Sequence, residues 1–341
     1  MADNYAIVVG LNRYPGIVPL QGPENDAKWF RTWLLTHSLV KAENATLILS
    51  SDFAAESETI DAQPDTAAID RAFERLLRIG IKKEKVGKRL YLFFSGHGFG
   101  PTINDAALLM ANCDASLGIT GHYVNAVMYA DFMATAAFFD EILLFMDCCR
   151  DDLWRAPGRN PPWQSLRNVE AGNVKRFYGL ATRWAQKARE APTADGTVHG
   201  YFTRALKAAF EGGAVDANRK LSTSTVMSFT LNYVQGVIKP ELAQKNFRAP
   251  EPQFPQKDDL VIATGLTPKL TEVAIAFSPA SQPNKREFVL TGGASVVSRP
   301  NTTGADPWAH ELGFGHYAVL DPNGGVVAEF DAFGEKVNVS V

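Results

Sequence analysis

The sequence predicts an α/β fold, in which a mostly parallel sheet is flanked by helices, followed by a small all-β, sandwich-like domain. Short apolar runs alternate with amphipathic segments through the first two thirds of the chain, which is typical of a parallel sheet covered on both faces. After about Gly265 the chain changes to short alternating runs broken by Pro, Asn and Gly, which is typical of an all-β module. We therefore expect one domain over residues 1–264 and an accessory domain over residues 265–341 of the 341-residue chain.

The first half of the chain supplies four expected strands and two expected helices. Apolar stripes at helical spacing predict the helices over residues 22–39 and 64–80. Pro23 suits the first turn of the first helix, Asp65 suits the N-cap of the second, and Gly80 suits its end. Four apolar runs predict buried strands, at residues 5–12, 45–51, 88–96 and 140–149.

The second half continues the alternation and then changes texture. Residues 176–185 predict a fifth strand, and residues 200–212 and 222–238 predict two more helices. The stretches 150–175 and 189–199 show no period, and we expect both to be irregular. Among the short C-terminal strands, "DPNGG" at residues 321–325 predicts a hairpin turn.

Composition and charge exclude several classes of function. The formal charge of -3 provides no field that would collect nucleic acid or an anionic membrane. No apolar run reaches the ~20 residues that a membrane span needs, and the start of the chain lacks a secretory signal. Three cysteines, two of them adjacent, do not make a disulfide framework. We expect a reduced, soluble, cytoplasmic protein with no nucleic-acid and no membrane partner.

Reactive side chains follow two of the expected strands. His97 lies inside "SGHGFG" directly after the run 88–96, and Cys148 and Cys149 end the run 140–149. Because the carboxyl ends of parallel strands meet at one edge of a sheet, where ligands bind, we expect these side chains to be close together. An imidazole within reach of a thiol can take its proton and so supply the thiolate nucleophile. The sequence therefore predicts nucleophilic catalysis at this edge, with the flanking glycines allowing close backbone approach to a substrate.

The two motifs together resemble the caspase and metacaspase superfamily of cysteine peptidases. "SGHG" and "DCCR" each follow a strand, and Cys149 lies 52 residues after His97, against about 50 in the caspase pattern. "NDA" at residues 25–27 and "GYFTRAL" at residues 200–206 resemble further family segments, so the resemblance covers about residues 5–263. It implies the caspase-like (caspase-hemoglobinase) fold, with a large-subunit-like part (1–150), a linker loop (150–175) and a small-subunit-like part (176–264).

The resemblance implies the roles of the catalytic residues. Cys149 matches the nucleophile, and Cys148 takes the small, buried position before it. His97 matches the general base and acid. The N–H groups of Gly98 and Cys149 would form the oxyanion hole. Asp151 stands where the family has a glycine, which is a departure from the pattern.

The resemblance also implies the specificity. Asp147 stands two residues before the nucleophile, where metacaspases carry an acid, and Asp26 and Ser95 complete the resembling S1 pocket. A carboxylate at the floor of this pocket favours Arg or Lys at P1 and repels Asp or Glu. We expect a cysteine endopeptidase that cuts protein or peptide substrates after Arg and, second, after Lys. A strand-end cap or an ion pair is the alternative role for Asp147, and an acid in a helical first turn is favourable anyway, as at Asp26.

Activation and biological role are implied only by the resemblance. The linker loop and its edge carry basic residues at which the protein could process itself: Arg155, Arg159, Arg167, Lys175 and Arg176. Calcium activates some members of the family, but no EF-hand spacing is present, so we expect no cofactor and no metal. The resemblance associates such chains with regulated proteolysis, for example in bacterial defence, in which a partner protein could activate the enzyme.

Three other interpretations remain open. A zinc site built from Cys113, Cys148, Cys149 and a histidine lacks paired C-x-x-C spacing. The alternative function is a catalytically inactive caspase-like scaffold, which the substituted Asp151 favours and the intact dyad disfavours. A third interpretation makes the accessory domain the functional half, released by the peptidase. The remaining histidines carry no motif, and surface or core roles suffice for them: His37, His122, His199, His310 and His316.

Overall fold

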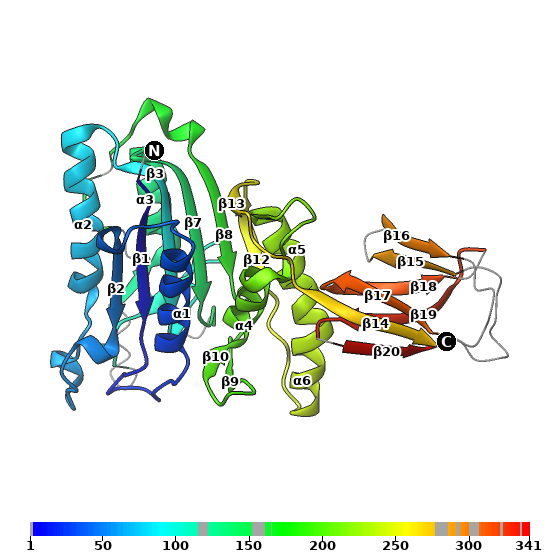
Figure 1. Ribbon diagram of the computed structural model, residues 1–341. Coiled ribbons are helices and arrows are strands. Elements are labelled where there is room, and N and C mark those ends of the chain that lie inside the picture. The colour runs from blue at the N-terminus through cyan, green and yellow to red at the C-terminus, as the bar shows by residue number, and fades with distance from the viewer. Residues whose placement is uncertain are drawn as a thin grey trace. The chain divides into compact units, whose positions relative to one another are not determined.

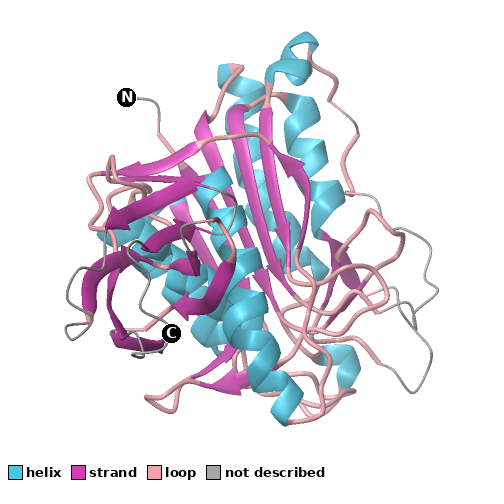
Figure 2. Cartoon of the chain, turned by 90° about the vertical axis from the view of Figure 1, so that its right-hand side faces the viewer, coloured by secondary structure: helices cyan, strands magenta, loops and turns pink. Residues whose placement is uncertain are grey.

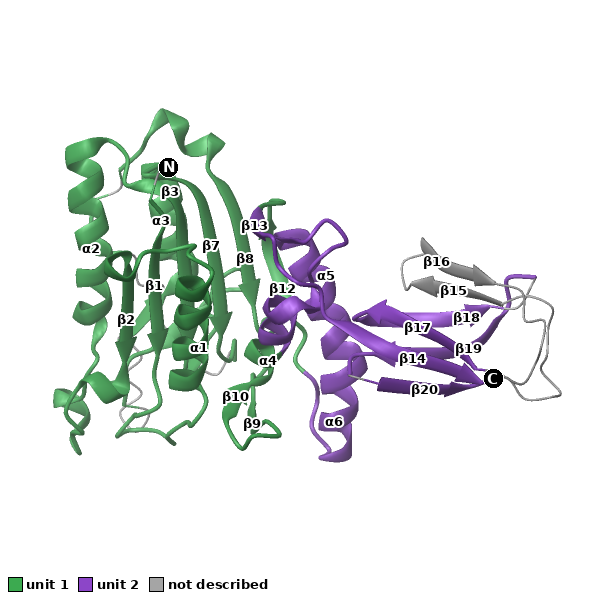
Figure 3. Cartoon of the chain, in the orientation of Figure 1, with its two compact units in different colours: residues 1–204, 250–260 green, residues 205–249, 261–341 purple. Residues whose placement is uncertain are grey.

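The computed structural model describes residues 3–114, 122–151, 161–164, 166–276, 286–290, 294–299, 307–320, 323–334 and 336–341. The chain divides into two compact units, Met1–Arg204 with Pro250–Leu260, and Ala205–Ala249 with Val261–Val341 (Figure 3). The second unit thus begins within the small-subunit-like segment, and the domain boundary expected after residue 264 stays a prediction. No helix of the described residues is both long enough and apolar enough to cross a membrane.

A six-stranded sheet forms the centre of the first unit. Its strands lie side by side in the order β12-β8-β7-β3-β1-β2 (Figure 1). All neighbours are parallel except β12, which pairs antiparallel with β8 at one edge. This arrangement confirms the predicted fold class. The strands are β1 (Tyr5–Gly10), β2 (Ala45–Leu49), β3 (Gly87–Ser95), β7 (Phe139–Asp147), β8 (Lys175–Leu180) and β12 (Gln253–Lys257).

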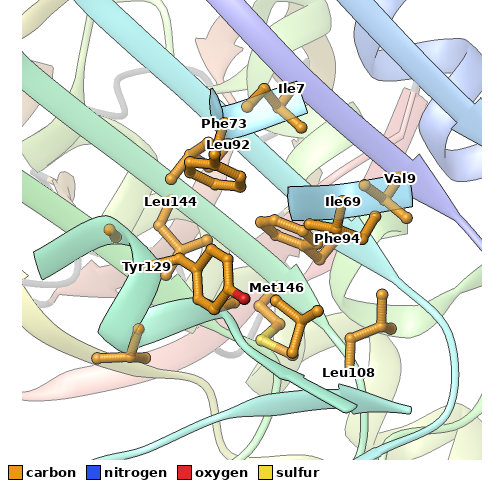
Figure 4. Close-up of a cluster of buried hydrophobic side chains, with 14 of the residues drawn as sticks. Ile7, Val9, Ile69, Phe73, Leu92, Phe94, Leu108, Tyr129, Leu144 and Met146 are labelled. Carbon is orange, nitrogen blue, oxygen red and sulfur yellow. The ribbon is translucent and has the colours of Figure 1, made fainter. Parts of the chain in front are cut away.

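Helices cover both faces of this sheet, as Figure 2 shows. On one face, α2 (Thr66–Lys83) and α3 (Ala126–Ala136) pack on the side chains that alternate along β1, β3 and β7 (Figure 4). On the other face, α1 (Pro23–Thr36) contributes Phe30, which stacks on Phe93 with ring centroids 4.8 Å apart. The next helix, α4, spans Tyr201–Ala208. Burying alternate residues on both faces explains why these strands are apolar throughout.

The helix ends match the sequence in two places and differ in one. Pro23 begins α1, and the Asp65 side chain accepts a hydrogen bond from the Ala68 N–H as the N-cap of α2. Gly80, expected as a helix end, lies inside α2 instead. A Cβ at Gly80 would collide with the ring of Phe138, so this glycine serves close packing against the helix and not its termination.

Two small β elements follow the carboxyl edge of the sheet and were not expected. The strands β4 (Gly98–Phe99), β5 (Ala107–Leu109) and β6 (Tyr123–Asn125) form an antiparallel sheet after His97. Residues 189–199, expected to be irregular, contain an antiparallel hairpin of β9 (Glu190–Pro192) and β10 (Val198–Gly200). These strands have two or three residues each, which is too short for an alternating pattern to show in the sequence.

The second unit combines helices with the C-terminal strands. Its described residues form two sheets, β17-β14-β20 and β16-β15-β18-β19, besides the pair β11-β13. The predicted hairpin is confirmed, because β18 and β19 pair antiparallel on either side of residues 321–325. Phe229 of α5 packs on Phe314 and Phe333, with ring centroids 6.3 and 5.8 Å away, and this contact joins helices and strands into one unit. The bounds are β11 (Lys220–Ser222), α5 (Thr223–Tyr233), α6 (Lys239–Gln244), β13 (Val261–Thr264), β14 (Leu270–Ala276), β15 (Arg286–Leu290), β16 (Ala294–Arg299), β17 (Trp308–Gly313), β18 (Gly315–Leu320), β19 (Val326–Ala332) and β20 (Lys336–Ser340).

Candidate active site

The register of β3 and β7 sets the positions of the two reactive side chains. The parallel pair aligns Ser95 with Asp147 at the carboxyl ends of the strands. His97 and Cys149 each stand two residues beyond this aligned pair. The equal offset places both just outside the same edge of the sheet, from neighbouring strands.

His97 is half-buried and oriented by two contacts. Its ring Nε2 lies 2.7 Å from the carbonyl oxygen of Val18, and its backbone N–H donates to the Tyr14 hydroxyl at 3.1 Å. Because a carbonyl oxygen can only accept, Nε2 carries a proton, and Nδ1 of the neutral ring is left as an acceptor. Burial lowers the pKa of His97, so the ring is neutral at pH 7 and can take up a proton.

Cys149 is half-buried and its thiol contacts the loop after β8. The sulfur donates to the carbonyl oxygen of Ala188 at 3.6 Å. Burial raises the pKa of this thiol. No hydrogen bond joins the thiol to His97 within the described part of the chain. At rest the thiol and the imidazole are therefore both neutral, and the thiol contacts the carbonyl of Ala188 instead of Nδ1 of His97.

The backbone N–H groups of Gly98 and Cys149 make no ladder hydrogen bond in the described part of the chain. Among the described residues, the N–H of Cys149 donates to no backbone carbonyl. Leu109 donates its N–H to the carbonyl of His97 at 2.8 Å, so the alternating pattern of an antiparallel ladder turns the N–H of Gly98 away from β5. These are the two groups to which the resemblance assigns the oxyanion hole, and the structure leaves both without a backbone acceptor among the described residues.

The glycines on either side of His97 allow close packing. A Cβ at Gly96 would lie 2.5 Å from the Tyr14 hydroxyl, and a Cβ at Gly98 would lie 2.6 Å from the sulfur of Cys148. Tyr14 holds the backbone of His97, so the close approach at Gly96 helps to orient the imidazole. The sequence suggested that these glycines make room for a substrate. In the structure the space beside them is filled by the side chains of Tyr14 and Cys148, so close packing within the protein is an alternative reason for a glycine at each position.

Asp26 and Ser95 meet in a buried cluster at the start of α1. Asp26 is 0% exposed. Its Oδ2 accepts from the Ser95 hydroxyl at 2.9 Å and from the Gly200 N–H at 3.3 Å, and its Oδ1 lies 2.7 Å from Nδ1 of His199. Burial raises the pKa of Asp26, although these hydrogen bonds oppose the shift. Both oxygens of this carboxyl group are therefore already occupied by the protein itself.

Beside this cluster lies Asp147, and only one of its two carboxyl oxygens accepts hydrogen bonds from the described residues. Its Oδ2 accepts from the N–H and from the hydroxyl of Thr203, each at 2.8 Å. Its Oδ1 accepts no hydrogen bond from any described residue. Burial, followed by the charge of Asp26, raises the pKa of Asp147 to about 7. A carboxyl group that ionises near neutral pH, and of which one oxygen has no partner among the described residues, can accept a cationic group.

Two residues at the site were not predicted from the sequence, Glu190 and His199. Glu190 is half-buried and accepts from the N–H groups of Gln21 and Gly22, at 3.1 and 2.9 Å. Burial is the main influence on the pKa of His97 and of Asp147, and the charge of Glu190 raises both, so this carboxylate is near both groups. The hairpin β9–β10 carries both unpredicted residues, and nothing in their local sequence marks the strand pairing that brings them here.

Arg150 follows the nucleophile and ties together the loops around it. Its side chain is 3% exposed. The guanidinium donates to the carbonyl oxygens of Ile103, Asp105 and Thr182, at 2.5, 3.0 and 3.1 Å. No carboxylate of the described residues forms an ion pair with it, and burial lowers its pKa. One side chain thus fixes the loop after β4 and the loop after β8, which carries the acceptor of the Cys149 thiol.

Replacing Arg150 should destabilise the protein strongly. Arg150→Met removes a buried cation together with three hydrogen bonds and leaves three carbonyl groups without a donor, so we expect the free energy of unfolding to fall by about 3–5 kcal/mol. Arg183→Met is the matched control, because Arg183 lies next to Thr182 in the loop that Arg150 contacts, with 46% of its side chain exposed in an ion pair with Glu251. For this control we expect a loss within about 1 kcal/mol. Urea unfolding in a Cys149→Ala background measures both values, and equal losses would contradict the role of Arg150.

Asp151 and Cys148, the two neighbours of the Cys149–Arg150 pair, both make contacts within the protein. Asp151, which replaces the family's glycine, forms a bridge with Phe99, and its carbonyl accepts from the Gly100 N–H at 3.1 Å. Cys148 is buried, with its sulfur 4.0 Å from the carbonyl oxygen of Ala107, and burial raises the pKa of its thiol well above the usual value. Among the described residues, no three His, Cys, Asp or Glu side chains gather as a metal site would require.

Comparisons with known proteins identify the family of the domain that contains the central sheet and the candidate site. A family model described as a caspase domain, peptidase family C14, matches residues 3–269. Among solved structures, caspase-1 from Spodoptera frugiperda is similar, with 13% sequence identity and a TM-score of 0.49. The alignment covers 76% of this chain and 90% of that chain. No curated protein matches the chain.

Proposed function

Because the chain belongs to the caspase-domain family of cysteine peptidases, we propose that it is a cysteine endopeptidase that cuts protein chains after Arg and, less readily, after Lys. The observation that carries the proposal is Asp147, a buried carboxyl group two residues before the Cys149 thiol, whose Oδ1 accepts no hydrogen bond from the described residues. The dyad supplies the chemistry and this carboxyl group supplies the selectivity.

The proposed reaction uses the hydrogen-bond partners of the dyad. When substrate arrives, the Cys149 thiol turns from Ala188 and gives its proton to Nδ1 of His97, while its sulfur bonds to the scissile carbonyl carbon. The oxyanion accepts from the N–H groups of Gly98 and Cys149. His97 then protonates the leaving amine as the C–N bond breaks, which leaves a thioester. Water, losing its proton to His97, hydrolyses the thioester and the thiol is restored.

The carbonyl of Val18 supports both proton transfers. It accepts from Nε2 of His97 at 2.7 Å, which fixes the ring with Nδ1 as the basic nitrogen. The same hydrogen bond strengthens when the ring becomes an imidazolium, because the donor is then charged. His97 is thus held in one orientation while it takes up the proton from the thiol and gives it to the amine.

The proposed P1 preference follows from the charges near Asp147. A planar guanidinium pairs with a carboxylate through two hydrogen bonds, whereas an ammonium offers a single point charge, so Arg should exceed Lys. Glu190, whose charge acts on both Asp147 and His97, adds to the negative potential there. An acidic P1 side chain would meet repulsion from both groups. Both oxygens of Asp26 already bind protein groups, so Asp26 acts on the P1 side chain only through its charge near Asp147.

Matched fluorogenic peptides that end in Arg, Lys, Asp or Ala test the proposal. We expect kcat/KM to follow the order Arg, Lys, Ala, Asp, with Arg exceeding Ala by about 10²-fold or more, because an unpaired buried carboxylate penalises a neutral side chain. Faster cleavage of the Asp peptide than of the Arg peptide would contradict the assigned specificity. Hydrolysis of none of the four would favour the inactive-scaffold alternative. A covalent thiol probe then decides, since the half-buried Cys149 of a scaffold would react no faster than an ordinary thiol.

Self-processing belongs to the same proposal. Arg155 and Arg159 lie outside the described residues. Lys175 and Arg176 lie in β8, paired to β7 within the central sheet, which makes them poor substrates because a peptidase binds an unpaired, extended chain. Arg167 is exposed and outside helices and strands, so it is the described position best suited to a cut. An activating partner, a role in bacterial defence and a cytoplasmic location stay predictions.

A further inference from the structure

Asp26 and His199 form a buried carboxylate–imidazole pair beside Asp147. Their Oδ1 and Nδ1 atoms are 2.7 Å apart, and the two residues are 0% and 5% exposed. The sequence offered no motif at His199. A buried imidazole is commonly a satisfied core residue, but here its partner is one of two carboxyl groups in a single cluster.

The pair fastens the β9–β10 hairpin to the beginning of α1. Asn25 donates to the carbonyl of Val198 at 3.0 Å, next to the contact between His199 and Asp26. The Gly200 N–H also donates to Asp26, and a Cβ at Gly200 would collide with the carboxyl group of Asp147. The pair therefore fixes the glycine that leaves room directly beside Asp147.

Asp26 also contributes to the charge that Asp147 experiences. Two neighbouring carboxylates oppose each other's ionisation, and the charge of Asp26 is the largest influence on Asp147 after burial. Glu190 acts in the same direction as Asp26, and Thr203 opposes both through its two hydrogen bonds. His199 itself faces Asp26 and, more distantly, Asp195. The imidazole of His199 lies in direct contact with Asp26, with Nδ1 2.7 Å from Oδ1, so a proton on both ring nitrogens would place a positive charge against this carboxylate.

We propose that His199 is a specificity-determining positioning residue: as the counter-ion of Asp26, it leaves Asp147 as the carboxylate that a basic P1 side chain meets. This inference rests on the proposed preference for Arg and Lys. It assigns the two acids different functions, since Asp26 binds its own chain and Asp147 binds the substrate.

Two substitutions should move the ionisation of Asp147 in opposite directions. His199→Asn places an amide nitrogen near the position of Nδ1, so it can keep the hydrogen bond to Asp26 but cannot carry a positive charge. Asp26→Asn removes the negative charge, while its amide oxygen can still accept from Ser95 and Gly200. We expect the pKa of Asp147 to rise by about one unit in His199→Asn and to fall by about one unit in Asp26→Asn.

Carbon-13 NMR of protein labelled at the Asp carboxyl carbons measures this pKa without any substrate. The labelled protein carries Cys149→Ala, and the resonance that disappears in Asp147→Asn identifies Asp147. An unchanged pKa in His199→Asn overturns the inference, whatever the protein cleaves. This readout therefore separates failure of the inference from failure of the proposed function.

The pH profile of cleavage supplies the second readout. The acid limb of kcat/KM for the Arg peptide should move up by about one pH unit in His199→Asn and down by a similar amount in Asp26→Asn. At pH 6 we then expect His199→Asn to be about tenfold slower than the wild type and to recover at pH 8.5. A merely structural role would lower the rate in both variants at every pH, and that result would also overturn the inference.

Discussion

Cys149→Ala is expected to abolish peptide hydrolysis while leaving the fold unchanged. The thiol is the group that forms the bond to the scissile carbon, so kcat should fall by about 10⁴-fold or more. The side chain is half-buried and its only described hydrogen bond is the long contact to the Ala188 carbonyl, so little stability is lost with it. The measurement is kcat for the Arg peptide, with circular dichroism and thermal unfolding to confirm the folded state.

Cys148→Ala is the matched control for the identity of the nucleophile. Its sulfur packs against Gly98 and β5 in the interior, away from the loop that contacts Cys149. Removing this sulfur should lower the free energy of unfolding by about 1 kcal/mol, as small truncations in a core do, and should leave cleavage within about tenfold of the wild type. Loss of activity in Cys148→Ala with retention in Cys149→Ala would reverse the assignment of the two cysteines.

The central sheet could be predicted because its strands are buried on both faces and are therefore continuously apolar. The same signal fails for β4 to β6 and for the β9–β10 hairpin, whose strands are too short to show a period. Gly80 shows a second limit, because a glycine marks a helix end and a close packing contact equally well. The phenyl ring of Phe138 that decides between them lies 58 residues further along the chain.

The residues of the candidate site also fall into those that the sequence could predict and those that it could not. His97, Cys149 and Asp147 could be placed from the sequence, because each follows or ends a recognisable strand and carries a reactive side chain. Val18 and Ala188 act through backbone carbonyls, which every residue possesses, so their identity carries no signal. His199 reaches Asp26 from 173 residues away, through a hairpin that only the folded chain forms.

Asp147→Asn is expected to remove the preference for a charged P1 side chain. The substitution keeps the shape of the side chain, and both Thr203 hydrogen bonds go to Oδ2, which an amide oxygen can replace. It removes the charge that would face a guanidinium, so kcat/KM for the Arg peptide should fall by about 10²–10³-fold. A peptide with citrulline, the neutral analogue of Arg, should be cleaved by Asp147→Asn at least as fast as by the wild type, because the variant has no carboxylate to leave unpaired. Asp151→Asn is the control, because Asp151 is an acid close to Cys149 but outside the Asp26–Asp147 cluster, and it should leave the Arg-to-citrulline ratio unchanged.

The same substitution should make the folded protein more stable at high pH, which separates a functional acid from a structural one. The pKa of Asp147 is raised from 3.8 to about 7, so the folded state binds this proton more tightly than the unfolded state, and stability falls as the pH rises between those values. Asp147→Asn has no such proton to lose, so its advantage in the free energy of unfolding should grow by about 3 kcal/mol from pH 5 to pH 8. Denaturant unfolding at the two pH values, in a Cys149→Ala background, measures this difference. A variant that is less stable than its parent at pH 8 would show that Asp147 is an ion-pair or capping residue of the fold. A variant that is more stable and has lost its selectivity would show that the chain keeps a destabilising carboxylate at the end of β7 for its substrate.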